Sequence, residues 1–291
     1  MENKYQESFV TMCKNLKKRK TTNNKNKALS DLSQMMKMLG LEYKLIDEKN
    51  LSGKSMIAYK NKDFKYLVIA DYNVRDIMYL KCRQKINDQT YNSKKQILNL
   101  SFIMIVTLLI ATIGIIIVFT LGKNNSFATI IGVLIILFSL LFPRMQDVFN
   151  ASKSAALFCL IEVAKKLMDL PIGICFLNET GNEQGLIHLE NEYPELTKIY
   201  INQIGKEENL YVLVKNKSLY SKLKAFETSI DKLELLENDQ DTIIRQFKNG
   251  ILISTCDFND ISCIMPGTPN DDVSNLGKID DILYLISQIA K

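Results

Sequence analysis

An almost uninterrupted hydrophobic window constrains this chain more than any other feature. Between Ile97 and Phe142 the only charged residue is Lys123. The first part, Ile97 to Leu121, has 25 uncharged residues. A helix of that length, at about 1.5 Å rise per residue, exceeds a hydrocarbon core of about 30 Å. The second part, Ser126 to Phe142, has 17 uncharged residues, which is the lower limit for spanning. The window therefore predicts two transmembrane helices, 97–121 and 126–142.

The polar connector at positions 122–126 is too short for a re-entrant loop, so the two predicted helices form an antiparallel hairpin. Basic residues flank the hairpin where the first helix begins and where the second helix ends, whereas the connector has one basic residue, Lys123. Those flanking residues are Lys81, Arg83, Lys85, Lys94, Lys95, Arg144 and Lys153. The positive-inside rule then predicts a multi-pass protein of the cell membrane with both termini in the cytoplasm. If the second run were instead interfacial, the two soluble parts would lie on opposite sides.

Small residues in the window predict where the two helices approach each other. They are Thr107, Ala111, Gly114 and Gly132, and they do not form a GxxxG motif. Neither predicted span holds an ionisable group, which argues against a proton or ion relay inside one subunit.

Charge divides the rest of the chain into two unlike parts. Residues 1–96 have a net charge of +11 and residues 144–291 one of −7. We predict three regions: a basic cytoplasmic α+β region at 1–95, the hairpin at 96–143, and an acidic cytoplasmic α/β domain at 144–291. A hairpin inserted into one composite domain would give the same sequence pattern, so that alternative stays open.

The basic N-terminal region reads as two amphipathic helices, near 5–16 and 29–39, followed by strands near 42–47, 55–60 and 64–71. Between the helices lies a cationic cluster with candidate contacts to anionic lipid. It comprises Lys17, Lys18, Arg19 and Lys20. A solvated helix end and flexible linker is the favoured interpretation of the cluster, and nucleic acid is disfavoured because no aromatic residue is interleaved for stacking.

The acidic C-terminal region alternates between strand and helix patterns. We predict strands at 172–177, 210–214 and 251–256, and helices at 151–169, 194–204, 219–233 and 279–290. This alternation is typical of βαβ units, hence of a partly parallel sheet covered by helices. The predicted fold class is a membrane protein in which a transmembrane hairpin joins a small α+β part to an α/β domain.

The residues that carry chemistry are sparse. His188 is the only histidine and stands among apolar neighbours, so no His-based metal site or catalytic triad is predicted. The six cysteines form no CxxC pair, which is typical of reduced, buried thiols. We therefore predict no catalytic residue, no metal and no cofactor.

One turn-rich acidic segment after the strand at 251–256 is a candidate ligand loop, because α/β proteins bind ligands at such strand ends. Its polar members are Asp257, Asp260, Thr268, Asp271 and Asp272. An ordinary surface loop is the competing interpretation.

Three functions fit these observations. The first is a membrane sensor and effector, in which a cytoplasmic domain senses a ligand or partner and oligomerised hairpins form a pore or perturb the bilayer. The second is a membrane-anchored scaffold or adaptor subunit of a larger complex. The third, a membrane-bound enzyme, rests on the α/β pattern alone. Expected partners are membrane lipid and either further copies of the chain or a membrane complex.

Overall fold

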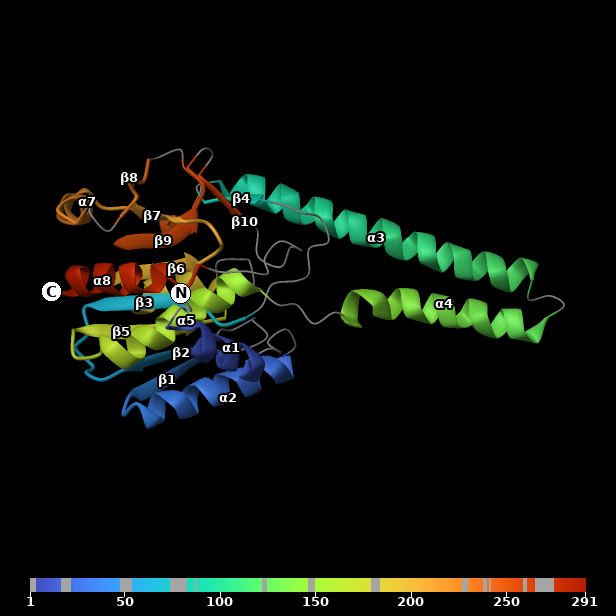
Figure 1. Ribbon diagram of the computed structural model, residues 1–291, viewed down its shortest axis with the longest axis horizontal. Helices are drawn as coiled ribbons and strands as arrows, with labels where there is room; N and C mark the ends of the chain where they lie inside the picture. The colour runs from blue at the N-terminus through green and yellow to red at the C-terminus, as the bar shows by residue number, and fades with distance from the viewer. Residues whose placement is uncertain are drawn as a thin grey trace.

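One large sheet runs through the body of the protein, and a long helical hairpin projects from it (Figure 1). The computed structural model describes most of the chain. The described residues are 4–16, 22–47, 54–73, 83–86, 88–121, 125–145, 150–178, 184–226, 230–237, 240, 242–258, 261–264 and 275–291.

Helices and strands alternate along most of the described chain. The helices are α1 (Gln6–Asn15), α2 (Thr22–Met38), α3 (Gln89–Thr120), α4 (Ser126–Met145), α5 (Ala151–Lys166), α6 (Gln184–Glu192), α7 (Lys217–Lys224), the 3₁₀ helix η2 (Ile243–Gln246) and α8 (Lys278–Ala290). The strands are β1 (Glu42–Asp47), β2 (Lys54–Tyr59), β3 (Tyr66–Asp71), β4 (Arg83–Lys85), β5 (Ile172–Leu177), β6 (Thr197–Gln203), β7 (Asn209–Val214), β8 (Lys232–Leu235), β9 (Gly250–Cys256) and β10 (Ser262–Ile264).

The main sheet has eight strands in the order β1-β2-β5-β3-β6-β9-β7-β8. Its centre, β5-β3-β6-β9, is parallel, while β1, β2 and β7 run antiparallel to a neighbour. Strand β3 precedes the hairpin in the chain, yet it pairs with β5 on one side and β6 on the other, both of which follow the hairpin. The chain segments before and after the hairpin thus build one sheet together.

This interleaving corrects the predicted fold class. A small α+β part and a separate α/β domain were expected on either side of the hairpin, and that prediction was wrong because β1, β2 and β3 are strands of the same sheet as β5 to β9. The sequence pattern could not show this, since pairing between segments a hundred residues apart leaves no local periodicity. The boundaries of the three predicted regions stay a prediction.

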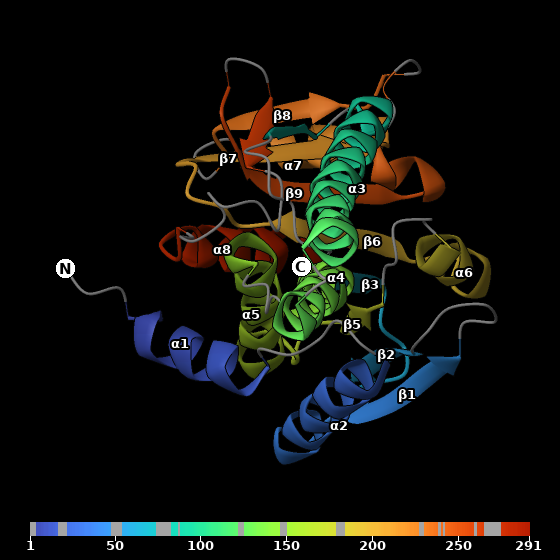
Figure 2. The ribbon, with the colours of Figure 1, turned by 90° about the vertical axis from the view of Figure 1, so that its right-hand side faces the viewer.

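Two apolar layers enclose the sheet. One face packs against α1, α2, α5, α7 and α8, and the other against α6 and η2. Figure 2 shows α5 and α8 on one side of the strands and α6 on the other. Helix α5 lies in the middle of the first layer and is buried from Ala151 to Ala164, which explains why its sequence is apolar on nearly all sides.

The segment 194–204 was predicted as a helix and is instead mostly strand β6. Ile199 and Ile201 face one core layer and Tyr200 the other, so apolar side chains occur on consecutive residues. A strand buried on both faces loses the period-two signal that marks a half-exposed strand.

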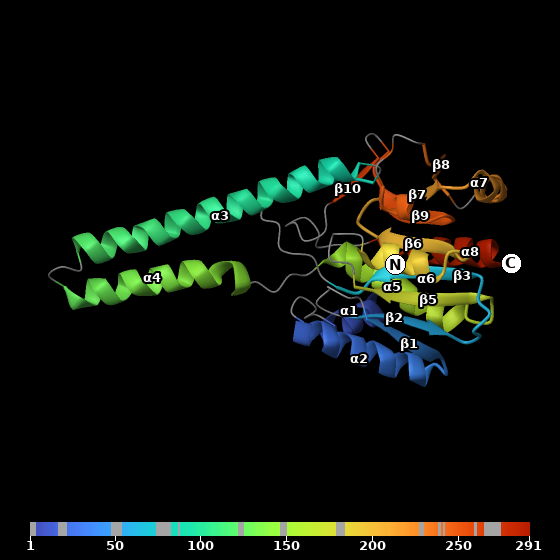
Figure 3. The ribbon, with the colours of Figure 1, turned by 180° about the vertical axis from the view of Figure 1, so that it is seen from behind.

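Helices α3 and α4 form the projecting hairpin and pack antiparallel against each other (Figure 3). Nearly all large apolar side chains of α3 are exposed, including Leu109 at 60%. Among the described residues α3 alone is long and apolar enough to cross a membrane, and the apolar part of α4, Ser126–Ser139, is shorter. The prediction of two transmembrane spans is corrected accordingly: the described residues show one candidate span, α3.

The root of α3 is a separate structural unit. Strand β4 pairs with β10, and the Asp88 carboxylate caps α3 by accepting a hydrogen bond from the backbone N–H of Tyr91 at 2.8 Å. The apolar spacing of Val74, Ile77 and Met78 predicts a helix that continues into the first span. Its first part, 74–82, lies outside the described residues, and β4 interrupts the remainder.

Substitution of Gly132 by leucine is expected to destabilise the packing of α3 against α4 by about 1–3 kcal/mol, the usual cost of overpacking. A Cβ atom at Gly132 would lie 2.5 Å from Cγ2 of Val118 and 2.8 Å from the carbonyl oxygen of Gly114. Thermal unfolding of the detergent-solubilised protein by circular dichroism measures the effect. Val133→Leu enlarges an exposed side chain of the same helix and is the control. Equal melting curves for the two variants would contradict the observed contact.

Candidate functional site

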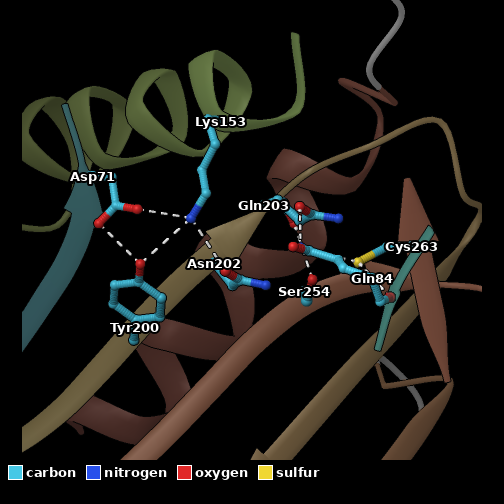
Figure 4. A network of polar contacts seen from close by, with 8 residues as sticks. All are labelled: Asp71, Gln84, Lys153, Tyr200, Asn202, Gln203, Ser254 and Cys263. Carbon is cyan, nitrogen blue, oxygen red and sulfur yellow. Dashed lines mark hydrogen bonds and ion pairs between the residues drawn. The ribbon is translucent and has the colours of Figure 1, made fainter. Parts of the chain in front are cut away.

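The carboxyl ends of the central parallel strands face the hairpin, and polar side chains gather there (Figure 4). Three of these strands end in a buried or half-buried polar residue: Asp71 at the end of β3, Asn178 just after β5, and Asn202 near the end of β6. Ligands of open α/β sheets bind outside the carboxyl ends of the strands. We call this region the carboxyl edge.

Asp71, Lys153, Tyr200 and Asn202 form the first half of the polar network. Nζ of Lys153, from the first turn of α5, lies 2.8 Å from Oδ2 of Asp71. The Tyr200 hydroxyl donates to Oδ1 of Asp71 at 2.9 Å. Nζ of Lys153 also donates to Oδ1 of Asn202 at 3.2 Å. The ion pair is almost fully buried, with 3% and 4% of the two side chains exposed.

The second half of the network connects β6 to the root of α3. The Gln84 amide of β4 donates to Oε1 of Gln203 at 2.7 Å and lies 3.5 Å from Sγ of Cys263. Ser254 of β9 donates to the carbonyl oxygen of Gln203 at 3.5 Å. Strand β4, which precedes α3, is therefore bonded directly to the end of β6 at the carboxyl edge.

A β-bulge shapes the end of β6. Ile201 pairs with Ile253 and Gln203 with Ser254, so Asn202 is the extra residue in the β6–β9 ladder. Bulges of this kind re-aim a side chain and are common beside active sites. The Asn202 side chain is half-buried, and within the described residues its Nδ2 group has no hydrogen-bond partner.

Two further side-chain amides at this edge are buried without a partner. Asn150, just before α5, and Asn178, just after β5, are 1% and 0% exposed. Neither the nitrogen nor the oxygen of either side chain has a hydrogen-bond partner in the described structure. Unsatisfied buried amides are uncommon in folded proteins and point to a bound polar group or water.

The predicted ligand loop is described only at its start. Asp257, at the end of β9, is 40% exposed and lies 3.5 Å from the Arg83 guanidinium, which also donates to Oγ of Ser262 at 2.6 Å. The other four candidates lie outside the described residues: Asp260, Thr268, Asp271 and Asp272. The predicted lipid contacts lie outside them as well, namely Lys17, Lys18, Arg19 and Lys20.

The predicted packing residues all lie on the hairpin. Gly114 and Gly132 face each other at the helix crossing, since a Cβ at either position would come within 3 Å of the other glycine's carbonyl oxygen. Thr107 and Ala111 are partly buried on α3.

Histidine and cysteine contribute no reactive group here. His188, expected to pack among apolar neighbours, is exposed on α6, with Nε2 3.4 Å from Glu192. Burial raises the pKa of the Cys256 thiol to about 12 and also raises that of Cys263. Both thiols are therefore protonated at neutral pH and poor nucleophiles.

Solved structures with this fold are known. The LapA aminopeptidase of Legionella pneumophila matches with a TM-score of 0.54 and 8% identity, covering 98% of this chain and 70% of that one. Glutaminyl cyclase of Bacteroides thetaiotaomicron matches with a TM-score of 0.53 and 12% identity over 98% and 96%. A Zn-dependent exopeptidase of Parabacteroides distasonis matches with a TM-score of 0.53 and 10% identity over 99% and 98%. No family model and no curated protein sequence matches the chain.

The likeness shows the fold and corrects three expectations. A membrane sensor and effector, a scaffold or adaptor, and a chain without enzymatic activity were predicted from the hydrophobic hairpin and from the lack of a catalytic constellation in the sequence. The complete body instead shares its fold with aminopeptidases, an exopeptidase and glutaminyl cyclases, so those predictions were wrong. The membrane hairpin on which those functions depended is corrected with them, and the described residues contain one helix that is long and apolar enough to span a bilayer.

The described residues do not fit a zinc ion. They contain no group of three or more histidine, cysteine, aspartate or glutamate side chains placed to hold a metal. At the carboxyl edge both oxygens of Asp71 are already bonded, one to Lys153 and one to Tyr200. The lone histidine of the sequence lies on α6 and is paired with Glu192.

Proposed function

We propose that this protein is an enzyme that acts on the amino-terminal end of a peptide or protein at the carboxyl edge. The observation that carries the proposal is the bulge at Asn202, which adds a half-buried side-chain amide to the polar network at the carboxyl edge. The fold supports the substrate class, since exopeptidases, aminopeptidases and glutaminyl cyclases share it.

Each part of the carboxyl edge would have a distinct role. The side-chain amides of Asn150, Asn178 and Asn202 can both donate to and accept from a peptide backbone. The Asp257 carboxylate is half-exposed and suited to pair with the ammonium group of an amino terminus. The remaining loop candidates, Asp260, Thr268, Asp271 and Asp272, would extend this acidic surface.

A substrate panel tests the proposal. The purified protein is incubated with aminoacyl-methylcoumarin amides and with peptides that begin with glutamine, and release of fluorophore or of a cyclised product is measured. Turnover is expected, and Asn202→Ala is expected to lower kcat/KM by about tenfold or more, the equivalent of one hydrogen bond to a charged or reacting group.

Matched controls come from the opposite edge of the sheet. Asn61→Ala, in the turn between β2 and β3, is the control for Asn202→Ala, and Asp169→Asn, which is 87% exposed, is the control for Asp257→Asn. Absence of turnover of every substrate would refute the proposed function. Equal losses in the edge variants and their controls would refute the proposed site.

We also propose that α3 holds the protein in the cell membrane with the body on the cytoplasmic side. An exposed apolar surface as long as that of α3 would otherwise face water. Because strands before and after the hairpin share one sheet, the chain would return from α3 through the antiparallel helix α4, so that both sides of the hairpin lie on the same face of the membrane. The basic residues 17–20 would then contact anionic lipid. Self-association stays a prediction, which light scattering in detergent tests.

Leu109→Lys is expected to release a large share of the protein from membranes during alkaline extraction. A lysine at the middle of a span costs about 2.5–3.5 kcal/mol on insertion scales. The control is Leu45→Lys, an exposed position of the body. If alkaline extraction releases the wild-type protein as completely as a peripheral protein, the proposal that α3 anchors the chain in the membrane is refuted. This outcome is independent of the enzyme assay.

A further inference from the structure

The buried ammonium group of Lys153 is the most unusual feature of the carboxyl edge. Lysine is rarely buried completely, and a buried charge must be neutralised by a partner. Here the side chain is 3% exposed and faces a carboxylate that is 4% exposed. We propose that the Lys153 ammonium is the resident cation of this site, and that it pairs with the Asp71 carboxylate in place of a metal ion.

The hydrogen bonds of the cluster are mutually consistent. An ammonium group has three protons and no lone pair. Nζ of Lys153 has three oxygen neighbours: Oδ2 of Asp71 at 2.8 Å, Oδ1 of Asn202 at 3.2 Å and the Tyr200 hydroxyl at 3.4 Å. The Tyr200 hydroxyl donates its proton in a hydrogen bond to Oδ1 of Asp71. Its oxygen can therefore accept a hydrogen bond from Lys153. Among the described residues of this cluster, which Figure 4 labels, the one positive charge of Lys153 lies beside the one negative charge of Asp71.

A metal ion would have to break this arrangement. Zinc binds carboxylate oxygen at about 2.0–2.2 Å, which would place a dication against the ammonium group that already lies 2.8 Å from Asp71. The other neighbours of Lys153 are a phenol and a carboxamide, whereas structural and catalytic zinc sites use histidine, cysteine and carboxylate. In a metal-dependent protein of this fold, the positive charge comes from the metal ion. Here the positive charge beside Asp71 comes from the chain itself, as the Lys153 ammonium.

This inference does not rest on the proposed peptide chemistry, since metal dependence can be measured on protein that turns over no substrate. Full-length protein is produced in zinc-supplemented medium and purified without chelator. Its metal content is determined by mass spectrometry, and its melting temperature is recorded in EDTA and in excess zinc chloride. We expect far less than one metal ion per chain and the same melting temperature in both buffers.

Asp71→Asn shows whether any bound zinc sits at this site. A zinc-dependent rise in melting temperature that wild type shows and Asp71→Asn lacks would overturn the inference. An equal zinc-dependent rise in melting temperature in both proteins would mean that zinc binds to other residues. Asp71 would then be paired with Lys153, as proposed. If Asp71→Asn does not fold, the double variant Asp71→Asn/Lys153→Met, in which neither charge is buried, takes its place.

Discussion

Lys153→Met is expected to lower the free energy of unfolding by about 3–5 kcal/mol, the usual cost of removing one partner of a buried ion pair. The substitution preserves much of the apolar volume but leaves the Asp71 carboxylate buried without its cation. Chemical unfolding in detergent, followed by circular dichroism, measures the loss. The double variant Asp71→Asn/Lys153→Met should recover most of it, because no uncompensated charge remains.

The surface ion pair between Lys60 and Asp169 supplies the control. Its side chains are 58% and 87% exposed, so Lys60→Met should cost less than about 1 kcal/mol. If Lys153→Met were as harmless as Lys60→Met, or if the double variant were no more stable than Lys153→Met, the buried pair would not hold the carboxyl edge together.

Phe158→Ala is expected to cost about 3–5 kcal/mol as well, the usual range for truncating a buried phenylalanine. Phe158 of α5 is 1% exposed, and its ring contacts Tyr5 and Phe9 edge-to-face at centroid distances of 5.9 and 5.7 Å. Alanine would leave a cavity between α5 and α1. Because this contact holds α1 on the body, hydrogen exchange should also accelerate throughout α1.

Phe258→Ala removes the same side chain from an exposed position and should change stability by less than about 0.5 kcal/mol. A small loss for Phe158→Ala, or unchanged hydrogen exchange in α1, would mean that α1 is not docked through these rings.

The local parts of the fold could be predicted from the sequence. The strands at β5, β7 and β9 and the last helix carry clear hydrophobic patterns, and so does the long apolar helix α3. The order of strands could not be predicted, because β3 finds its two neighbours only after α3 and α4 have intervened. The predicted helix at 219–233 is observed as α7, which ends at Lys224, and the last two predicted positions belong to strand β8, whose residues are only partly buried at the sheet border.

The candidate site was predictable only in part. Asp257 was singled out because it follows a strong strand pattern, and the same reasoning would have found Asp71 and Asn178, which lie at the ends of two other predicted strands. Asn202 could not be found in this way, because the segment 194–204 was predicted as a helix. Lys153 could not be found in this way. It was counted among the basic residues flanking the hairpin, and only the packing of α5 across the sheet reveals it as a buried partner of Asp71.

Residues 144–291, produced alone, provide the most direct test that one sheet is built from both sides of the hairpin. Without β3, strands β5 and β6 lose the partner that lies between them, and no continuous sheet can form. We expect the isolated segment to give a poorly dispersed amide spectrum and no cooperative thermal transition. Spectral dispersion and the transition should both return when residues 1–88 are co-produced. A well-dispersed spectrum with a cooperative transition in the isolated segment would contradict this expectation.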